Sequence, residues 1–164
     1  GVESRFIQES RFQFRLGVLF DKLGNKPDSI NRMKRVIELN PRDAQALNYL
    51  GYTYAEMGIN LEEALGYIKR ALEIRPDDGF FLDSLGWVYY QLKRYDDAVK
   101  QLEKAASLVP DDPTVLEHLG DAYLARKETK KAIKMYKQAL QLDPKKQGLS
   151  EKIKNVLKGE AGER

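Results

Sequence analysis

Four prolines recur along the chain at nearly constant intervals, and each ends a short segment of similar pattern. They are Pro41, Pro76, Pro110 and Pro144, which close the segments VIELNP, ALEIRP, ASLVP and ALQLDP. The interval is 34 or 35 residues. A repeat of this length predicts stacked copies of one supersecondary unit, since each copy is too small to bury its own apolar face.

Two further markers recur in the same register. A Leu-Gly pair is followed, three residues after the glycine, by an aromatic residue, and the glycines are Gly17, Gly51, Gly86 and Gly120. The second half of each unit opens with a small residue, at Ser29, Ala64, Ala98 and Ala132. Glycine inside a helix costs about 0.5–1 kcal/mol relative to alanine. We therefore expect these glycines to allow the two helices of a unit to approach closely.

The spacing of apolar residues predicts two helices in each unit. In residues 46–57, Leu47, Leu50 and Tyr54 recur at helical spacing, and in residues 61–74, Ala64 and Ile68 do the same. Each repeated proline lies just beyond the second helix. Because proline lacks the N–H that a helix needs to continue, it is expected to end that helix.

The combined pattern of Leu-Gly-x-x-Tyr, a following Ala and a closing Pro resembles the tetratricopeptide repeat family. The resemblance implies an all-α, right-handed superhelix of four helix-turn-helix units and a C-terminal capping helix. The expected units are residues 10–43, 44–78, 79–112 and 113–146, preceded by residues 1–9 as an extension or a remnant of another repeat and followed by a capping helix and tail at 147–164. The first unit departs from the family at Ser29, where Ala is usual.

The two ends of the array differ in character. At the C-terminal end, Ser150 is the expected N-cap of a capping helix that runs to Lys158, with Ile153, Val156 and Leu157 as its apolar stripe. At the N-terminal end, Phe6 and Ile7 are not preceded by a cap. We expect that the first unit originally stacked on further repeats, and that its open face is a site of self-association.

Composition excludes several classes of function. The 164 residues carry a net charge of only +3, which does not by itself indicate nucleic-acid binding. The absence of cysteine removes disulfides, thiolate metal sites and cysteine nucleophiles. A lysine-rich region near the C-terminus, which includes Lys130, Lys134 and Lys137, is interpreted as a solvated outer face, with phosphate or anionic lipid as the alternative ligand.

The segment FLDSLGWVYYQL contains three aromatic residues of different expected roles. Tyr89 shares a helical face with Leu82 and Leu85, the repeat's packing positions, whereas Trp87 and Tyr90 lie on another face. By the resemblance, that second face lines a concave groove. The alternative is that these aromatics pack against a neighbouring repeat and enlarge the core, and this alternative weighs most for Phe80 and Tyr49.

Carrying this register to the other units gives the predicted groove, which is aromatic in the middle, basic at one end and acidic at the other. Its residues are Arg11, Phe14, Arg15, Asn48, Tyr49, Tyr52, Phe80, Asp83, Ser84, Trp87, Tyr90, Glu117, His118 and Asp121. Some members of the family clamp a C-terminal carboxylate with Lys, Asn and Arg, and that clamp is missing here. An extended or helical peptide with apolar anchors suits an aromatic groove better.

The predicted function is therefore a protein-interaction module that binds a partner peptide or helix, with a self-assembling scaffold as the alternative. No catalytic residue, metal or cofactor is expected, since His118 has only Glu117 and Asp121 near it in sequence and there is no glycine-rich phosphate loop. The chain is also similar to the C-terminal repeats of large bacterial multi-repeat adaptors, often envelope lipoproteins. Cytoplasmic and periplasmic or outer-membrane-associated locations both stay open.

Overall fold

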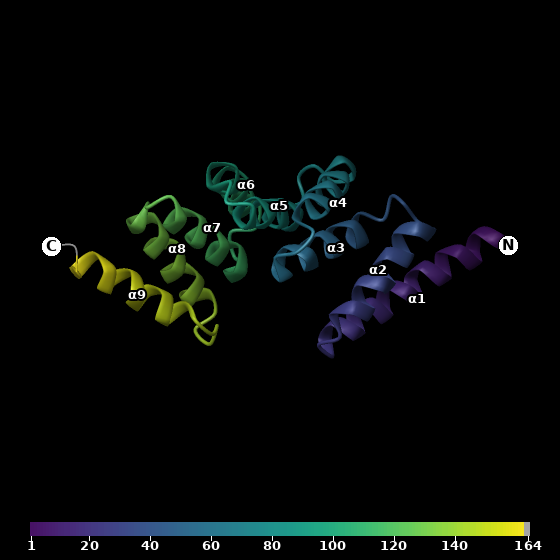
Figure 1. The fold of residues 1–164 in the computed structure, drawn as a ribbon, viewed down its shortest axis with the longest axis horizontal. Coiled ribbons are helices and arrows are strands. Elements are labelled where there is room, and N and C mark those ends of the chain that lie inside the picture. The colour runs from purple at the N-terminus through teal and green to yellow at the C-terminus, as the bar shows by residue number, and fades with distance from the viewer. Residues whose placement is uncertain (163–164) are drawn as a thin grey trace. The chain divides into compact units, whose positions relative to one another are not determined.

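The structure, a computed structural model, describes residues 1–162, with side chains described through residue 159. Over these residues the chain forms helices and no strand, which confirms the predicted all-α fold class (Figure 1). The chain divides into two compact units. Unit 1 comprises residues 1–76, and unit 2 begins at Asp77.

Unit 1 consists of two helical hairpins in sequence. Its helices are α1 (Val2–Lys22), α2 (Lys26–Leu39), α3 (Ala44–Met57) and α4 (Leu61–Ile74). Helix α1 packs on α2, α2 packs on α3, and α3 packs on α4. Residues 2–9 form the first turns of α1, and the helix continues past the expected boundary at residue 10.

Unit 2 repeats the same arrangement and adds one helix. Its helices are α5 (Gly79–Gln91), α6 (Tyr95–Leu108), α7 (Pro113–Ala125), α8 (Thr129–Leu142) and α9 (Leu149–Gly162). The hairpins α5–α6 and α7–α8 pack through α6 and α7, and α9 packs on α8. Helix α9 thus occupies the place that the first helix of a further repeat would take.

The first helix of each of three hairpins begins at an aspartate two residues after a repeated proline. The side chains of Asp43, Asp78 and Asp112 accept hydrogen bonds from backbone N–H groups of the first turn of α3, α5 and α7. Such a cap satisfies donors that the helix itself leaves unpaired. The Pro-x-Asp sequence therefore ends one helix and starts the next within a few residues.

The four repeated glycines lie where the second helix of each hairpin comes closest to the first. An added Cβ at Gly17, Gly51, Gly86 or Gly120 would lie 2.5–2.7 Å from a side-chain carbon of Met33, Ile68, Leu102 or Tyr136, respectively. All four of these neighbours are fully buried. The expectation that the glycines allow close approach is therefore confirmed.

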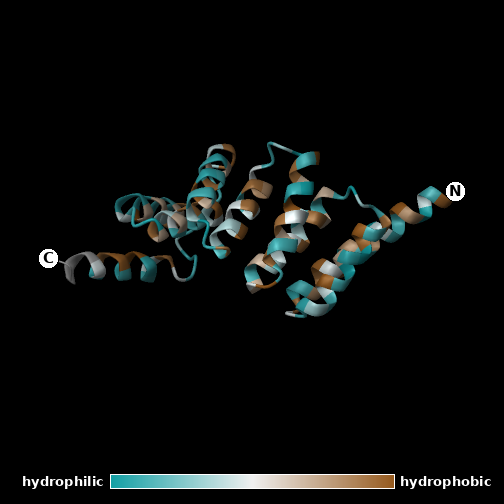
Figure 2. Ribbon diagram, turned by 45° about the horizontal axis from the view of Figure 1, so that its top comes forward, coloured by the Kyte–Doolittle hydropathy of each residue, from teal (hydrophilic) through white to brown (hydrophobic). Residues whose placement is uncertain are grey.

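The small residue that opens each second helix is also buried. Ala64, Ala98 and Ala132 are fully buried, and Ser29 exposes only 1% of its surface. Figure 2 shows hydrophobic and hydrophilic residues interspersed along the helices, as expected when one side of each helix faces a core and the other faces water.

The start of the last helix differs from the prediction. Helix α9 begins at Leu149, so Ser150 lies inside the helix and is not its N-cap. Leu149 is fully buried, and Gly148 before it takes a positive φ of 84°. The first backbone hydrogen bond of this end runs from Lys152 N–H to Gly148 O, so the helix starts one residue earlier than the capping rule applied to Ser150 predicts.

Candidate partner-binding site

The predicted groove residues all lie on the first helices of the hairpins. Some of them belong to unit 1 and the others to unit 2. Unit 1 holds those of α1 and α3, and unit 2 holds those of α5 and α7. The predicted aromatic middle of the groove is thereby divided. Tyr49 and Tyr52 belong to unit 1, whereas Phe80, Trp87 and Tyr90 belong to unit 2.

In unit 2, Trp87 is held in a series of ring contacts. Its indole ring is nearly parallel to the ring of Tyr90, with centroids 4.7 Å apart, and stacks on His118 of α7 at 4.2 Å. Tyr90 in turn lies 5.6 Å from Tyr95 at the start of α6. Trp87 is half-buried, and its ring lies between those of Tyr90 and His118. Tyr95 was missed from sequence because it lies on a second helix.

Phe80 differs from the other aromatic residues of α5 because it faces solvent. It exposes 54% of its surface, although it lies two helical turns before Trp87 on the same side of the helix. Tyr89 is buried, as its place among the packing positions predicts. The aromatic side of α5 therefore runs from an exposed Phe80 to a half-buried Trp87 and Tyr90, which we call the α5 aromatic face.

Beneath this face lies a buried polar pair. His118 Nδ1 of α7 lies 2.9 Å from Asp83 Oδ1 and 3.1 Å from Asp83 Oδ2 of α5. Asp83, Ser84 and His118 expose only 6%, 3% and 7% of their surfaces, so they form part of the interior. From the sequence, Glu117 and Asp121 are the acidic residues near His118. In the structure its carboxylate partner is Asp83, which the packing of α5 on α7 brings close.

The predicted acidic end of the groove is occupied by a lysine of α9. Lys152 Nζ lies 2.8 Å from a carboxylate oxygen of both Glu117 and Asp121, and Lys146 lies 3.3 Å from Glu117. Burial raises the pKa of Glu117, but hydrogen bonds and attraction from Lys152 and Lys146 outweigh it, and the pKa lies below its ordinary value. Lys152 thus joins α9 to α7, and the carboxylates at the predicted acidic end of the groove are paired with lysines of the same chain.

In unit 1, Tyr49 is engaged within the fold. Its hydroxyl donates a hydrogen bond of 2.6 Å to Asp21 of α1, and Lys26 pairs with the same carboxylate at 2.5 Å. Burial and this hydrogen bond raise the pKa of Tyr49. The ring of Phe14 meets Tyr49 edge-on at 6.1 Å. Both aromatics therefore help to join α1 to α3, and their partner-binding role stays a prediction.

The remaining predicted residues of unit 1 are more open. Arg11 and Arg15 are exposed, and Asn48 and Tyr52 are half-buried. Arg11 also lines a hollow of about 740 Å³ between α1 and the end of α2, whose other lining residues include Phe6, Ile7 and Leu39. Phe6 and Ile7 expose 53% and 55% of their surfaces, so α1 presents apolar side chains to solvent.

The described residues contain no group of three or more His, Cys, Asp and Glu side chains that could hold a metal ion. No helix among them is long and apolar enough to cross a membrane. What the geometry offers is a set of rigid helices with aromatic and charged surfaces.

Tandem helical hairpins with close glycine contacts define a helical repeat protein. The tetratricopeptide repeat family profile matches residues 14–79 and 84–146. Because the two matches together span more than half of the chain, this protein belongs to the tetratricopeptide repeat family, as its sequence pattern predicts. A comparison with curated protein sequences found no match.

Solved structures with similar folds come from several proteins. PilF of Pseudomonas aeruginosa has a TM-score of 0.80 at 22% identity, over 96% of this chain and 71% of that one. MamA of Desulfovibrio magneticus RS-1 has a TM-score of 0.72 at 20% identity, over 90% and 83%. The first tetratricopeptide domain of Spaghetti (RPAP3), solved bound to the HSP90 peptide SRMEEVD, has a TM-score of 0.66 at 20% identity, over 72% and 93%. At these identities the likeness shows the fold alone.

Proposed function

We propose that this chain is a protein-binding module and that unit 2 holds an apolar segment of a partner on the α5 aromatic face. The observation that carries the proposal is the exposure of Phe80, which leaves 54% of a large aromatic side chain in solvent two helical turns before the stacked Trp87. Aromatic residues provide large contact area with few rotamers to restrict on binding, and they are frequent interface hot spots.

The rigidity of the face supports the same proposal. Trp87 and Tyr90 are held by each other and by His118 and Tyr95, so a partner would meet a surface that needs little ordering. A member of the same fold, the first tetratricopeptide domain of Spaghetti, is solved with a bound peptide. Peptide binding is thus a function that this architecture can perform.

Binding at this face can be followed by tryptophan fluorescence, because Trp87 is the chain's only tryptophan. A partner isolated by affinity capture should shift the tryptophan emission of the wild-type protein when titrated, since it would cover the half-buried indole. Phe80→Ser should weaken that binding about tenfold, the effect of losing roughly 1.4 kcal/mol at a hot spot. Its melting temperature should stay nearly unchanged because Phe80 is exposed.

Leu157→Ser is the matched control, since Leu157 exposes 47% of its surface on α9 of the same unit. This variant should bind the partner as the wild type does. Equal affinity of the wild type, Phe80→Ser and a Trp87→Phe variant would exclude the α5 aromatic face as the site.

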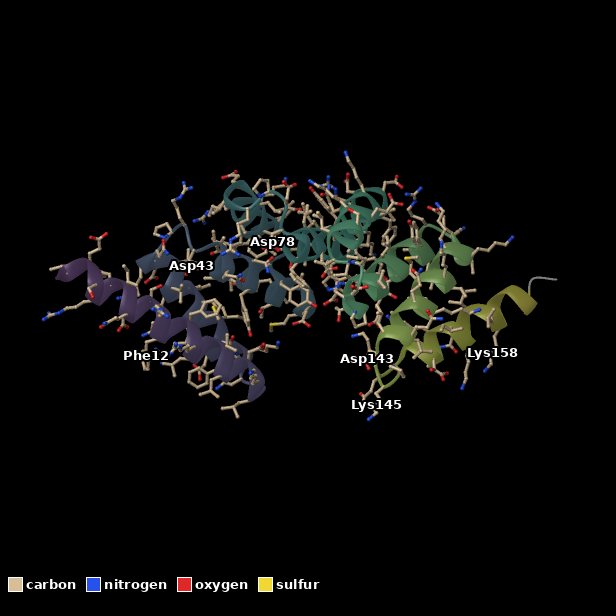
Figure 3. All side chains as sticks on the ribbon, turned by 180° about the vertical axis from the view of Figure 1, so that it is seen from behind. Phe12, Asp43, Asp78, Asp143, Lys145 and Lys158 are labelled. Atoms are coloured by element: carbon tan, nitrogen blue, oxygen red, sulfur yellow. The ribbon has the colours of Figure 1, made fainter. Side chains whose placement is uncertain are left out.

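A second candidate function is self-assembly through α1. Phe6, Ile7 and Phe12 each expose more than half of their surface, and Figure 3 labels Phe12 on α1. Phe6 and Ile7 line one hollow, and exposed apolar side chains that gather in a patch are a usual mark of interaction sites. If a second copy covers them, the mass in solution should rise with concentration, and a Phe6→Ser/Ile7→Ser double variant should stay monomeric. A wild-type mass that is independent of concentration would reject this candidate.

A further inference from the structure

Helix α8 of unit 2 has an unusual distribution of charge. It contains four lysines and no acidic residue. Lys131 pairs with Glu128 at 2.5 Å. The other three, Lys130, Lys134 and Lys137, are exposed, and none of them forms an ion pair within the described part of the chain. Their spacing places them along one side of the helix, and we call them the lysine ridge.

The corresponding helices of the other hairpins do not carry this ridge. When α4, α6 and α8 are aligned on Ala64, Ala98 and Ala132, the position of Lys130 is Glu62 in α4 and Asp96 in α6. The position of Lys134 is Gly66 in α4 and Lys100 in α6, and that of Lys137 is Lys69 in α4 and Glu103 in α6. Repeat architecture therefore does not require lysine at these three positions, and only α8 has it at all of them.

Lys130 is also placed against the helix dipole. It lies in the first turn of α8, where backbone N–H groups carry partial positive charge, and the equivalent turns of α4 and α6 hold two acidic residues each. A cation at this end is unfavourable for the isolated helix. Lys130 therefore does not stabilise α8 through the helix dipole, and its position is better explained by an interaction with an external anion.

A concave surface lies directly beside the ridge. A hollow of about 500 Å³ is formed by α6, the α6–α7 connection, α7 and α8, and its lining residues are Ala106, Ser107, Pro110, Asp111, Leu116, Met135, Gln138, Gln141 and Leu142. Leu116 is buried at its floor, and Leu142 exposes 45% of its surface at its rim. Gln141 of the lining lies one helical turn beyond Lys137 on the same side of α8, so the ridge reaches the edge of the hollow at its C-terminal end.

We propose that the lysine ridge and this hollow together bind an acidic segment of a protein partner that inserts one apolar side chain. The hollow has apolar side chains at its floor and rim, which suit an apolar anchor, and the ridge provides three uncompensated charges for acidic residues next to it. Asp111 lies in the hollow's lining away from α8 and fixes the orientation, because acidic residues of the partner would be repelled there. The ridge lies on a second helix, and Phe80, Trp87 and Tyr90 of the α5 aromatic face do not line the hollow.

The same features weigh against a membrane surface and against a nucleic acid as the ligand of this site. A membrane surface would not enter a concave hollow with an apolar floor. A nucleic acid strand long enough to follow the ridge would bring phosphates toward Asp111 and leave the apolar lining without a partner. The partner that uses both the charge and the hollow is an acidic peptide with an apolar residue.

The test is a titration of fluorescein-labelled peptides by fluorescence polarisation. The first peptide carries a run of glutamates followed by one phenylalanine, and the second has serine in place of the phenylalanine. Phosphatidylserine vesicles and a single-stranded DNA oligonucleotide are compared as competitors. The proteins are wild type, Lys130→Gln/Lys134→Gln/Lys137→Gln, and the control Lys145→Gln/Lys154→Gln/Lys158→Gln, which removes three exposed lysines elsewhere in unit 2.

Wild type should bind the phenylalanine peptide, and the ridge variant should bind it about tenfold or more weakly. The control variant and Phe80→Ser should retain the wild-type affinity, and the serine peptide should bind more weakly than the first. Circular dichroism melting confirms that both lysine variants are folded. Equal loss in the ridge and control variants, preference for vesicles or DNA, or no saturable peptide binding by the wild type would overturn the proposal.

Discussion

Gly86 of α5 faces Leu102 of α6 so closely that a Cβ at residue 86 would lie 2.5 Å from Leu102 Cγ. Leu102 is fully buried and has little room to move. We expect Gly86→Ala to lower the free energy of unfolding by about 1–3 kcal/mol, since overpacking outweighs the better helix propensity of alanine. Denaturant unfolding followed by circular dichroism measures the change.

Gly66 in α4 provides the opposite case. It lies within a helix, and an added Cβ there would meet nothing within 4 Å. Gly66→Ala should therefore raise the free energy of unfolding by about 0.5–1 kcal/mol. If both glycine substitutions shift stability in the same direction, the packing explanation of the repeated glycines is wrong.

Ser29 is a buried polar residue at a position where the other three hairpins have alanine. It exposes 1% of its surface, and its Oγ has no hydrogen-bond partner among the described residues. An unpaired buried hydroxyl is unfavourable by about 1–3 kcal/mol. Ser29→Ala should therefore stabilise unit 1, and its thermal melt should move to higher temperature; a lower melting temperature would show that the hydroxyl is satisfied.

The buried pair of Asp83 and His118 joins α5 to α7. Asp83→Ala should lower the free energy of unfolding by about 1–3 kcal/mol, because it leaves the imidazole without this partner in the interior. The emission of Trp87 should also change, since Trp87 stacks on His118. Asp97→Ala, which removes an exposed pair with Arg94, should cost within about 0.5 kcal/mol. Equal effects of the two substitutions would mean that the buried pair contributes no more to the free energy of unfolding than the exposed pair does.

Docking of α9 should depend on pH through Glu117. Its pKa lies below the ordinary value of 4.5 in the folded protein, so the folded state binds this proton less readily than the unfolded state. The resulting stabilisation is present above pH 4.5 and is lost as the pH falls through the folded-state pKa. Unfolding midpoints measured over this acidic range should fall less steeply in Lys152→Gln than in the wild type.

Lys154→Gln is the control for that measurement, since Lys154 is exposed on the same helix and carries the same charge. Its midpoints should follow the wild-type pH dependence. A wild-type slope that persists unchanged in Lys152→Gln would show that the contacts between Lys152 and Glu117 do not stabilise the folded state.

Several features of the site followed from the sequence register, and others did not. The register separated buried Tyr89 from Trp87 and Tyr90, because helical spacing decides which side of α5 each side chain occupies. The same register treated His118 and Glu117 as groove-lining residues. One is buried against Asp83 and the other is paired with Lys152, and both partners are more than 30 residues away in sequence.

The sequence by itself determined the family, the helical hairpins and the close contacts at the repeated glycines, because these depend on local spacing that recurs in every unit. The tertiary structure decided which polar residues are interior and where the exposed surface lies. Lys152 neutralises the predicted acidic end, and Phe80 stays in solvent although Trp87 on the same side is stacked. Such contacts form between side chains of different helices, and the sequence of a single repeat does not determine how those helices pack. The register of a residue therefore predicts its side of the helix but not the residues that it contacts.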